Sequence, residues 1–135
     1  MATSKVTYLG DLRTTCEHLK SGNTMITDAP TDNNGKGEAF SPTDTVATAL
    51  ASCMITIMGI RANKNGWSID GTEAMITKVM ASHPRRISEI HITMTVPGVA
   101  DNRNAQQVLK DAAINCPVAK SISPDIEQNV EFVFS

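Results

Sequence analysis

The sequence predicts an α+β fold in a single domain that covers residues 1–135. An N-terminal segment rich in Thr and Leu, with Val, Tyr and Ile among them, is broken by turn residues, which is typical of antiparallel strands. A long apolar segment with a helix start signal follows it. A later segment alternates apolar and polar residues, as a half-buried strand does. Along the sequence, predicted strands therefore come both before and after a central helix. We find no repeat or linker that divides the chain.

Residues 5–29 predict two or three strands of an antiparallel meander, with a hairpin near Gly22. Residues 28–40 are rich in Pro, Asp, Asn, Gly and Lys, so we expect a long irregular loop there. Loops of this length inside compact domains are often functional. The loop is therefore a candidate part of a functional site.

A helix start signal follows the loop at Ser41, Pro42 and Asp44. Ser41 can accept a hydrogen bond from a first-turn N–H, Pro42 suits the first helical position, and Asp44 can accept a hydrogen bond from the Ser41 N–H. The predicted helix continues through Cys53 and ends near Gly66. Because it is apolar most of the way round, we expect it to be buried between layers of the fold or between subunits.

The second half of the chain predicts three strands and two helices. The strands are expected over residues 69–80, 87–96 and 130–134, and the helices over residues 102–114 and 117–122. The strand at 87–96 has the clearest pattern, because Ile, Met and Val alternate there with Glu, His and Thr. Pro117 separates the two helices, since a proline cannot continue the first but can begin the second.

The charge balance argues against two classes of partner. Twelve basic and fourteen acidic residues give a formal net charge of −2, so we expect no binding of nucleic acid and no attraction to an anionic membrane surface. We find no apolar run of about 18 residues, as a membrane span would need, and no signal-peptide pattern at the N-terminus. The sequence therefore predicts a cytoplasmic protein. Only five residues are aromatic, and such a light core favours a dimer.

Three cysteines are the candidate reactive groups, and an odd number does not suggest a secreted disulfide framework. On the predicted helix, Cys53 has an almost entirely apolar face, which favours an inert, buried thiol unless a cation comes from elsewhere. Cys116 precedes Pro117 at a predicted N-cap, where a helix N-terminus can stabilise a thiolate, although an inconsequential cysteine fits equally well. Cys16 has the pattern of a structural or incidental strand residue. No Cys-x-x-Cys spacing is present, and we expect no metal site.

Two stretches of the sequence resemble the OsmC/Ohr family, which comprises the osmotically inducible protein C and the organic hydroperoxide resistance proteins. Residues 41–44 (SPTD), followed by residues 49–54 (ALASCM), resemble the first cysteine helix of that family. Residues 115–118 (NCPV) resemble its second cysteine motif, and residues 86–98 resemble its central strand. The resemblance covers nearly the whole chain, and the ordered set of motifs is specific.

The resemblance implies an OsmC-like fold: an intertwined homodimer with two antiparallel sheets around central helices and an active site at each subunit interface. It implies a thiol-dependent peroxidase that reduces organic hydroperoxides to alcohols. Cys53 would be the peroxidatic cysteine, and Cys116 the resolving cysteine that forms a disulfide with it. The implied reductant is an external dithiol, often lipoyl-linked, and no cofactor or metal is implied.

The resemblance also implies an arginine that stabilises the Cys53 thiolate and is oriented by a glutamate. Arg13 is the only arginine before Cys53, so it is the candidate. The family position of the glutamate holds Thr43 here. Other carboxylates could serve as the partner of the arginine: Glu38, Asp44 and Glu17. The departure at Thr43 favours an OsmC-like side branch, and it leaves open a non-catalytic dimer that binds a small apolar ligand.

Overall fold

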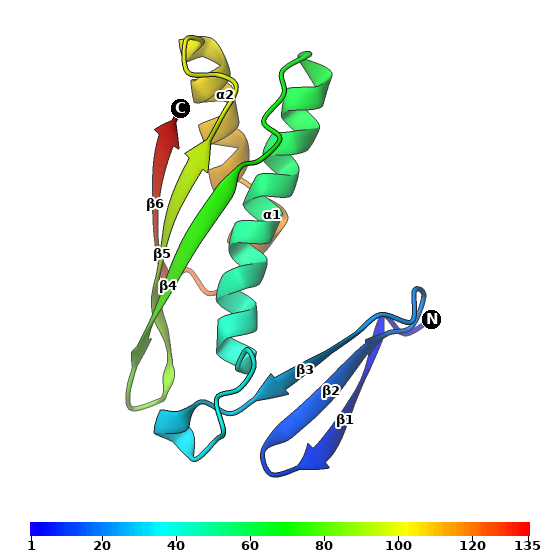
Figure 1. The fold of residues 1–135 in the computed structure, drawn as a ribbon. Coiled ribbons are helices and arrows are strands. Elements are labelled where there is room, and N and C mark those ends of the chain that lie inside the picture. Colours follow the sequence, from blue (N-terminus) through cyan, green and yellow to red (C-terminus); the bar gives the residue numbers. More distant parts are fainter. The chain divides into compact units, whose positions relative to one another are not determined.

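The computed structural model describes residues 1–135, which form two compact units, Met1–Val46 and Ala47–Ser135. The predicted α+β class is confirmed, because two three-stranded sheets are combined with helices (Figure 1). The single domain over residues 1–135 stays a prediction.

The first unit contains an antiparallel sheet of strands β1 (Ser4–Gly10), β2 (Arg13–His18) and β3 (Thr24–Asp28). The predicted hairpin near Gly22 joins β2 to β3. There the Gly22 N–H donates to the His18 carbonyl at 2.7 Å, and Gly22 has a φ of +79° that favours glycine. The turn sets the register of the hairpin, which determines the residues that lie opposite each other on β2 and β3.

The predicted irregular loop follows β3 and contains the short 3₁₀ helix η1 (Thr31–Asn33). Two backbone hydrogen bonds hold the loop: Asp28 N–H donates to the Phe40 carbonyl at 3.1 Å, and Gly37 N–H donates to the Ala29 carbonyl at 3.1 Å. The loop therefore returns to β3 before the next helix begins.

Helix α1 spans Pro42–Lys64 and begins with the predicted capping box. The Ser41 N–H donates to Asp44 Oδ2 at 3.0 Å, and the Asp44 N–H donates to Ser41 Oγ at 3.0 Å. One side of the helix is buried, and it consists of Ala47, Leu50, Ala51, Met54, Met58 and Ala62.

The composition of α1 corrects one expectation from the sequence. The helix has 23 residues and contains a window with mean hydropathy 1.5, so it is long and apolar enough to cross a membrane by length and composition alone. A core helix can pass the same test, and Leu50, Met54 and Met58 are fully buried in this fold. The sequence pattern missed this window because the helix has Thr and Ser scattered among its apolar residues.

The second unit contains the sheet β4–β5–β6, with strands β4 (Glu73–Ala81), β5 (Arg86–Val96) and β6 (Glu127–Phe134). We expected two antiparallel sheets. The first sheet is fully antiparallel, but in the second only β4 and β5 are antiparallel, while β6 runs parallel to β5.

Two helices explain why β6 is parallel. Helices α2 (Arg103–Ile114) and α3 (Pro117–Ser121) connect β5 to β6, and Figure 1 shows α2 beside the sheet. A crossover of this kind returns the chain to the end of the sheet where β5 began. The cap of α2 is Asn102, whose side chain accepts a hydrogen bond from the Ala105 N–H at 2.9 Å.

The core of the second unit lies between β5 and the helices. Strand β5 alternates as predicted, with Ile90, Ile92, Met94 and Val96 buried and the residues between them more exposed. The predicted strand at 69–80 was too long at its start, because residues 69–72 form a turn in which the Thr72 N–H donates to the Ile69 carbonyl at 3.1 Å. Gly71, with a φ of +90°, lies inside this turn.

Candidate functional site

Cys53 lies in α1, next to the buried side of the helix. Its side chain is half-buried and packs against the hydrophobic core of the second unit. The sequence pattern favoured a fully buried, inert thiol, and the structure leaves Cys53 more accessible than that. Ile57, one turn after Cys53 on α1, is also half-buried. Ile60, nearly one turn after Ile57, is 49% exposed.

Cys116 is the N-cap of α3, as predicted, and Pro117 occupies the first helical position. The Ala119 N–H donates to Cys116 Sγ at 3.4 Å. The expected stabilisation of a thiolate is nevertheless outweighed, because Cys116 is fully buried and this burial raises the pKa of its thiol above the ordinary value of 9.0. Cys116 is therefore a protonated thiol at neutral pH.

The structure brings Cys53 and Cys116 together, although 63 positions separate them in the sequence. The interaction with the neighbouring Cys53 side chain raises the pKa of Cys116 further, after burial. Both residues belong to the second unit, and both are free thiols. Two neighbouring thiols of this kind can be oxidised to a disulfide.

Arg13 lies at the start of β2 and forms a forked ion pair with Asp28. Arg13 Nε donates to Asp28 Oδ1 at 2.6 Å, and Arg13 Nη2 donates to Asp28 Oδ2 at 2.8 Å. The Asp28 side chain is only 1% exposed, whereas that of Arg13 is 27% exposed. The hydrogen bonds from Arg13 lower the pKa of Asp28, and Asp28 in turn raises the pKa of Arg13.

Glu38, one of the three predicted partners of Arg13, is the weaker of two carboxylates at the guanidinium. Its Oε1 lies 3.4 Å from Arg13 Nη2, and its side chain is 65% exposed. Its backbone N–H donates to Asp28 Oδ2 at 3.1 Å. Glu38 therefore supports the ion pair in two ways, through its carboxylate and through its main chain.

The other two predicted partners have different places. Asp44 caps α1, and Glu17 lies four residues along β2 from Arg13, a distance of about 13 Å in a strand. The carboxylates that raise the pKa of Arg13 are those of Asp28, Glu38 and Asp11. Neither Asp44 nor Glu17 is in this set, and both stay predicted partners only.

Asp28 was missed by the sequence reasoning, although a signal was present. In the hairpin that turns near Gly22, Arg13 lies directly opposite Asp28. Counting outward from the turn would have paired them, and residues directly opposite in an antiparallel pair have neighbouring side chains. Asp28 lies where the predicted strands over residues 5–29 and the predicted loop over residues 28–40 overlap, so its place in the hairpin was left open.

A groove of about 640 Å³ lies beside Glu38 in the first unit. Its lining is mostly apolar and includes Met25, Ile26 and Phe40. Phe40 is 54% exposed, although aromatic side chains are usually well buried. The first unit therefore presents an ion pair and apolar side chains close to each other.

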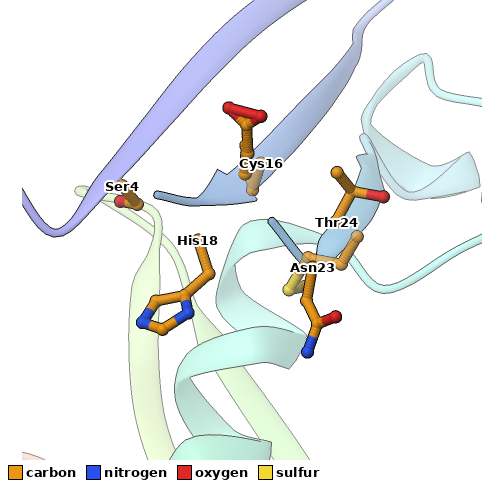
Figure 2. Close-up of a pocket in the computed structure, with 7 residues that line it drawn as sticks. Ser4, Cys16, His18, Asn23 and Thr24 are labelled. Atoms are coloured by element: carbon orange, nitrogen blue, oxygen red, sulfur yellow. The ribbon is translucent and has the colours of Figure 1, made fainter. Parts of the chain in front are cut away.

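Cys16 lies apart from the other cysteines, in the first unit. It lines a pocket of about 330 Å³ with Ser4, His18, Asn23 and Met25 (Figure 2). Within the chain, no group of three or more His, Cys, Asp or Glu side chains could hold a metal ion. The structure assigns Cys16 no reaction partner.

Comparison with known proteins shows which family the chain resembles. The chain matches the model of the OsmC-like protein family over residues 35–131. It is similar to the solved structure of a protein from Psychrobacter arcticus, which has been proposed to be an osmotic stress induced and detoxification response protein. The two are 58% identical with a TM-score of 0.94, over 98% of this chain and 96% of that chain. A comparison with curated proteins gives no match.

More distant solved structures share the fold. An organic hydroperoxide resistance protein from Legionella pneumophila is 16% identical, with a TM-score of 0.72 over 98% of both chains. Another, from Elizabethkingia anophelis, is 14% identical, with a TM-score of 0.77 over 100% of this chain and 98% of that chain. At these identities the likeness shows a common fold.

Proposed function

The chain belongs to the OsmC-like protein family, and on this premise we propose that it is a thiol peroxidase that reduces organic hydroperoxides. The observation that carries the proposal is the pair of neighbouring free thiols, Cys53 and Cys116. Several solved structures with the same fold are of proteins named for organic hydroperoxide resistance. Cys53 is the more accessible thiol, so it is the one proposed to meet the peroxide.

The proposed reaction has three steps. The Cys53 thiolate attacks the outer peroxide oxygen, the O–O bond breaks, and the alkoxide takes a proton to leave as an alcohol, with sulfenic acid on Cys53. The Cys116 sulfur then attacks the Cys53 sulfur. A disulfide forms, and the sulfenic hydroxyl leaves with the Cys116 proton as water. An external dithiol, of the lipoyl-linked kind, returns both cysteines to thiols and becomes a disulfide itself.

We propose Arg13 as the cationic residue of the first step. A guanidinium can stabilise both a thiolate and the negative charge that develops on the departing oxygen. The partner that the structure shows for Arg13 is Asp28, with Glu38 in second place. The proposed active site lies at a subunit interface, so either copy of the chain could supply the arginine.

Apolar surroundings support an organic substrate over hydrogen peroxide. Cys53 packs against the apolar core of its unit and is flanked on α1 by Ile57 and Leu50. An alkyl chain gains favourable burial on such a surface, which hydrogen peroxide cannot. The substrate class we propose is therefore hydroperoxides with an alkyl or fatty-acid group.

The proposed assembly is a homodimer in the cytoplasm, without a nucleic-acid or membrane partner. The formal net charge of −2 supports the absence of a nucleic-acid partner. Exposed apolar side chains such as Val6, Tyr8 and Ile60 support the dimer, because a second copy of the chain would cover them.

A second candidate function is a non-catalytic dimer that binds a small apolar ligand. Two observations favour it. Thr43 stands where the family resemblance places a glutamate, and burial raises the pKa of the Cys116 thiol, which slows the formation of a disulfide. Such a protein would bind an apolar molecule near Cys53 without consuming peroxide.

One experiment separates the two functions. Reduced protein is mixed with cumene hydroperoxide and dithiothreitol, and the loss of peroxide is followed beside a Cys53→Ser variant. A peroxidase consumes peroxide far faster than the variant. In a separate mixture without dithiothreitol, one equivalent of peroxide lowers its intact mass by two hydrogens as the disulfide forms. A binding dimer consumes no more than the variant, while an apolar ligand still raises its melting temperature.

A further inference from the structure

Asp28 is a buried carboxylate to which the three proposed steps give no role. Its side chain is 1% exposed and accepts three hydrogen bonds: from Arg13 Nε, from Arg13 Nη2 and from the Glu38 backbone N–H. Carboxylates are seldom this buried unless they are paired. Its ionised state is secure, since the hydrogen bonds from Arg13 lower its pKa despite burial.

The geometry of the ion pair with Asp28 fixes the orientation of the Arg13 guanidinium, and the negative charge of Asp28 stabilises its positive charge. Two parallel hydrogen bonds at 2.6 and 2.8 Å hold one edge of the planar group against both oxygens of Asp28. Arg13 Nη1 takes part in neither of these bonds, nor in the contact of Nη2 with Glu38. The N–H groups of Nη1 are therefore the ones that can donate hydrogen bonds to another group.

We propose that Asp28 is the positioning residue for Arg13 in peroxide reduction. This inference rests on the proposed roles of Cys53 and Arg13. Asp28 holds the Nε–Nη2 edge, so that Nη1 points in one direction. Glu38 adds a weaker contact from an exposed side chain, and its main-chain N–H ties the loop to Asp28. The effect of Asp28 on Cys53 is therefore transmitted through Arg13.

A purely structural ion pair would behave differently. It would stabilise the hairpin, so its loss would lower the melting temperature while the folded protein kept both its peroxide consumption and the reactivity of Cys53. A positioning residue loses its influence once the group that it positions is removed. A double-mutant cycle measures this dependence, and the melting temperatures of the same variants show whether a lost rate is merely lost folded protein.

The experiment compares the unmodified protein with Arg13→Ala, Asp28→Asn and the double variant. Two rates are measured at pH 7: the consumption of cumene hydroperoxide, and the alkylation of Cys53 by iodoacetamide, resolved from the other cysteines by peptide mass spectrometry. Iodoacetamide reports the thiolate without any turnover. We expect Asp28→Asn to lower both rates by about 10- to 100-fold. We expect the double variant to be no slower than Arg13→Ala.

Two further variants sharpen the comparison. Asp11→Asn removes a carboxylate whose charge also raises the pKa of Arg13 but which makes no hydrogen bond with it, so both rates should stay within about twofold. Arg13→Lys keeps the charge but cannot form the fork with Asp28, so it should lose as much as Asp28→Asn does. This lysine variant also decides the question if Asp28→Asn does not fold.

Two results would overturn the proposal. One is an equal loss from Asp28→Asn in the presence and absence of Arg13, which would show that Asp28 does not act through Arg13. The other is full activity and full alkylation in Arg13→Lys. If the unmodified protein consumes no peroxide, the peroxidase proposal fails, and the alkylation series still shows whether Asp28 acts on Cys53 through Arg13.

Discussion

At the scale of single residues, Cys116 shows that position and burial can act in opposite directions on one thiol. Its place at the N-cap of α3 gives it a hydrogen bond from the Ala119 N–H, which lowers its pKa. Complete burial is the larger influence, and it raises the pKa above 9.0. If Cys116 is the resolving cysteine, as proposed, these properties protect it from the solvent and from direct oxidation, because the thiolate is the reactive form.

The raised pKa of Cys116 predicts a pH-dependent resolving step. After a single equivalent of peroxide, the slower phase that closes the disulfide should accelerate as pH rises from 7 past 9, because a growing fraction of Cys116 becomes thiolate. Stopped-flow mixing followed by acid quench and intact mass measures this phase apart from the first. The Cys116→Ser variant should stop at the sulfenic acid. A rate that stays constant from pH 7 to 10 would contradict the raised pKa.

The lowered pKa of Asp28 predicts a loss of stability in acid. The unfolded chain protonates this carboxylate near the ordinary value of 3.8, while the folded chain does so only at lower pH. The unfolded state therefore binds more protons as the pH falls below 3.8, and the stabilisation from the Arg13–Asp28 pair is lost through that range. The stabilisation from the Arg13–Asp28 pair is fully present at neutral pH.

Urea denaturation at pH 7, 5, 4 and 3 tests this dependence. The free energy of unfolding of the unmodified protein should exceed that of Asp28→Asn at pH 7 and 5, and the difference should shrink at pH 3. Asp11→Asn is the matched control, because Asp11 influences Arg13 through its charge and forms no hydrogen bond with it. A difference that is the same at every pH would show that the charge of Asp28 does not contribute.

At the scale of elements, the loop between β3 and α1 depends on one glycine. A Cβ atom added at Gly35 would overlap the carbonyl group of Ala29, so the loop cannot keep its path with a larger residue there. This path returns the main chain to β3 and lets the Glu38 N–H reach Asp28. The loop is therefore coupled to the ion pair of Arg13 through its backbone.

We predict that Gly35→Ala destabilises the protein by about 1–3 kcal/mol, the usual cost of overpacking. Thermal unfolding measures the loss, and amide exchange at Glu38 should become faster. Gly59→Ala is the control, since a Cβ at Gly59 meets no atom within 4 Å and alanine favours a helix over glycine. If Gly35→Ala is as stable as Gly59→Ala, the close approach of Ala29 is not a constraint.

The elements also show where sequence reasoning succeeds. The capping box at Ser41 and Asp44, the alternation along β5 and the hairpin at Gly22 are local patterns, and all three are confirmed. The parallel direction of β6 and the pairing of Arg13 with Asp28 were missed, because both depend on which distant segments meet. The adjacency of Cys53 and Cys116 came from the family resemblance, not from the pattern of either segment.

At the scale of the whole molecule, the two units are unequal in their cores. In the second unit, a continuous set of apolar side chains from α1, β5 and α2 is buried. In Met1–Val46, by contrast, the buried side chains are Thr27, Asp28 and Ser41, none of them hydrophobic. A three-stranded sheet without a buried apolar face is marginally stable in water. The first unit therefore needs cover for its exposed apolar side chains, and a second copy of the chain could supply it.

The exposed side of α1 is the place where we expect a second copy to bind. Only 33% of the apolar window of this helix is buried within the chain. Ile60 is 49% exposed and lies two turns from Cys53 on the same side of the helix. A dimer that covered this side would bury apolar surface and exclude water near the reactive thiol, two effects that the proposed reaction needs.

We predict that Ile60→Glu weakens the dimer and lowers peroxide consumption together, because a carboxylate would be buried at the interface without a partner. Size-exclusion chromatography with light scattering should give twice the 14.5 kDa chain mass for the unmodified protein and a lower mass for the variant. Met75→Glu is the matched control: Met75 is 77% exposed on β4, outside the expected interface, so its variant should remain dimeric and active. A monomeric unmodified protein would contradict the dimer. An Ile60→Glu variant that stays a fully active dimer would place the interface elsewhere and separate assembly from the chemistry of Cys53.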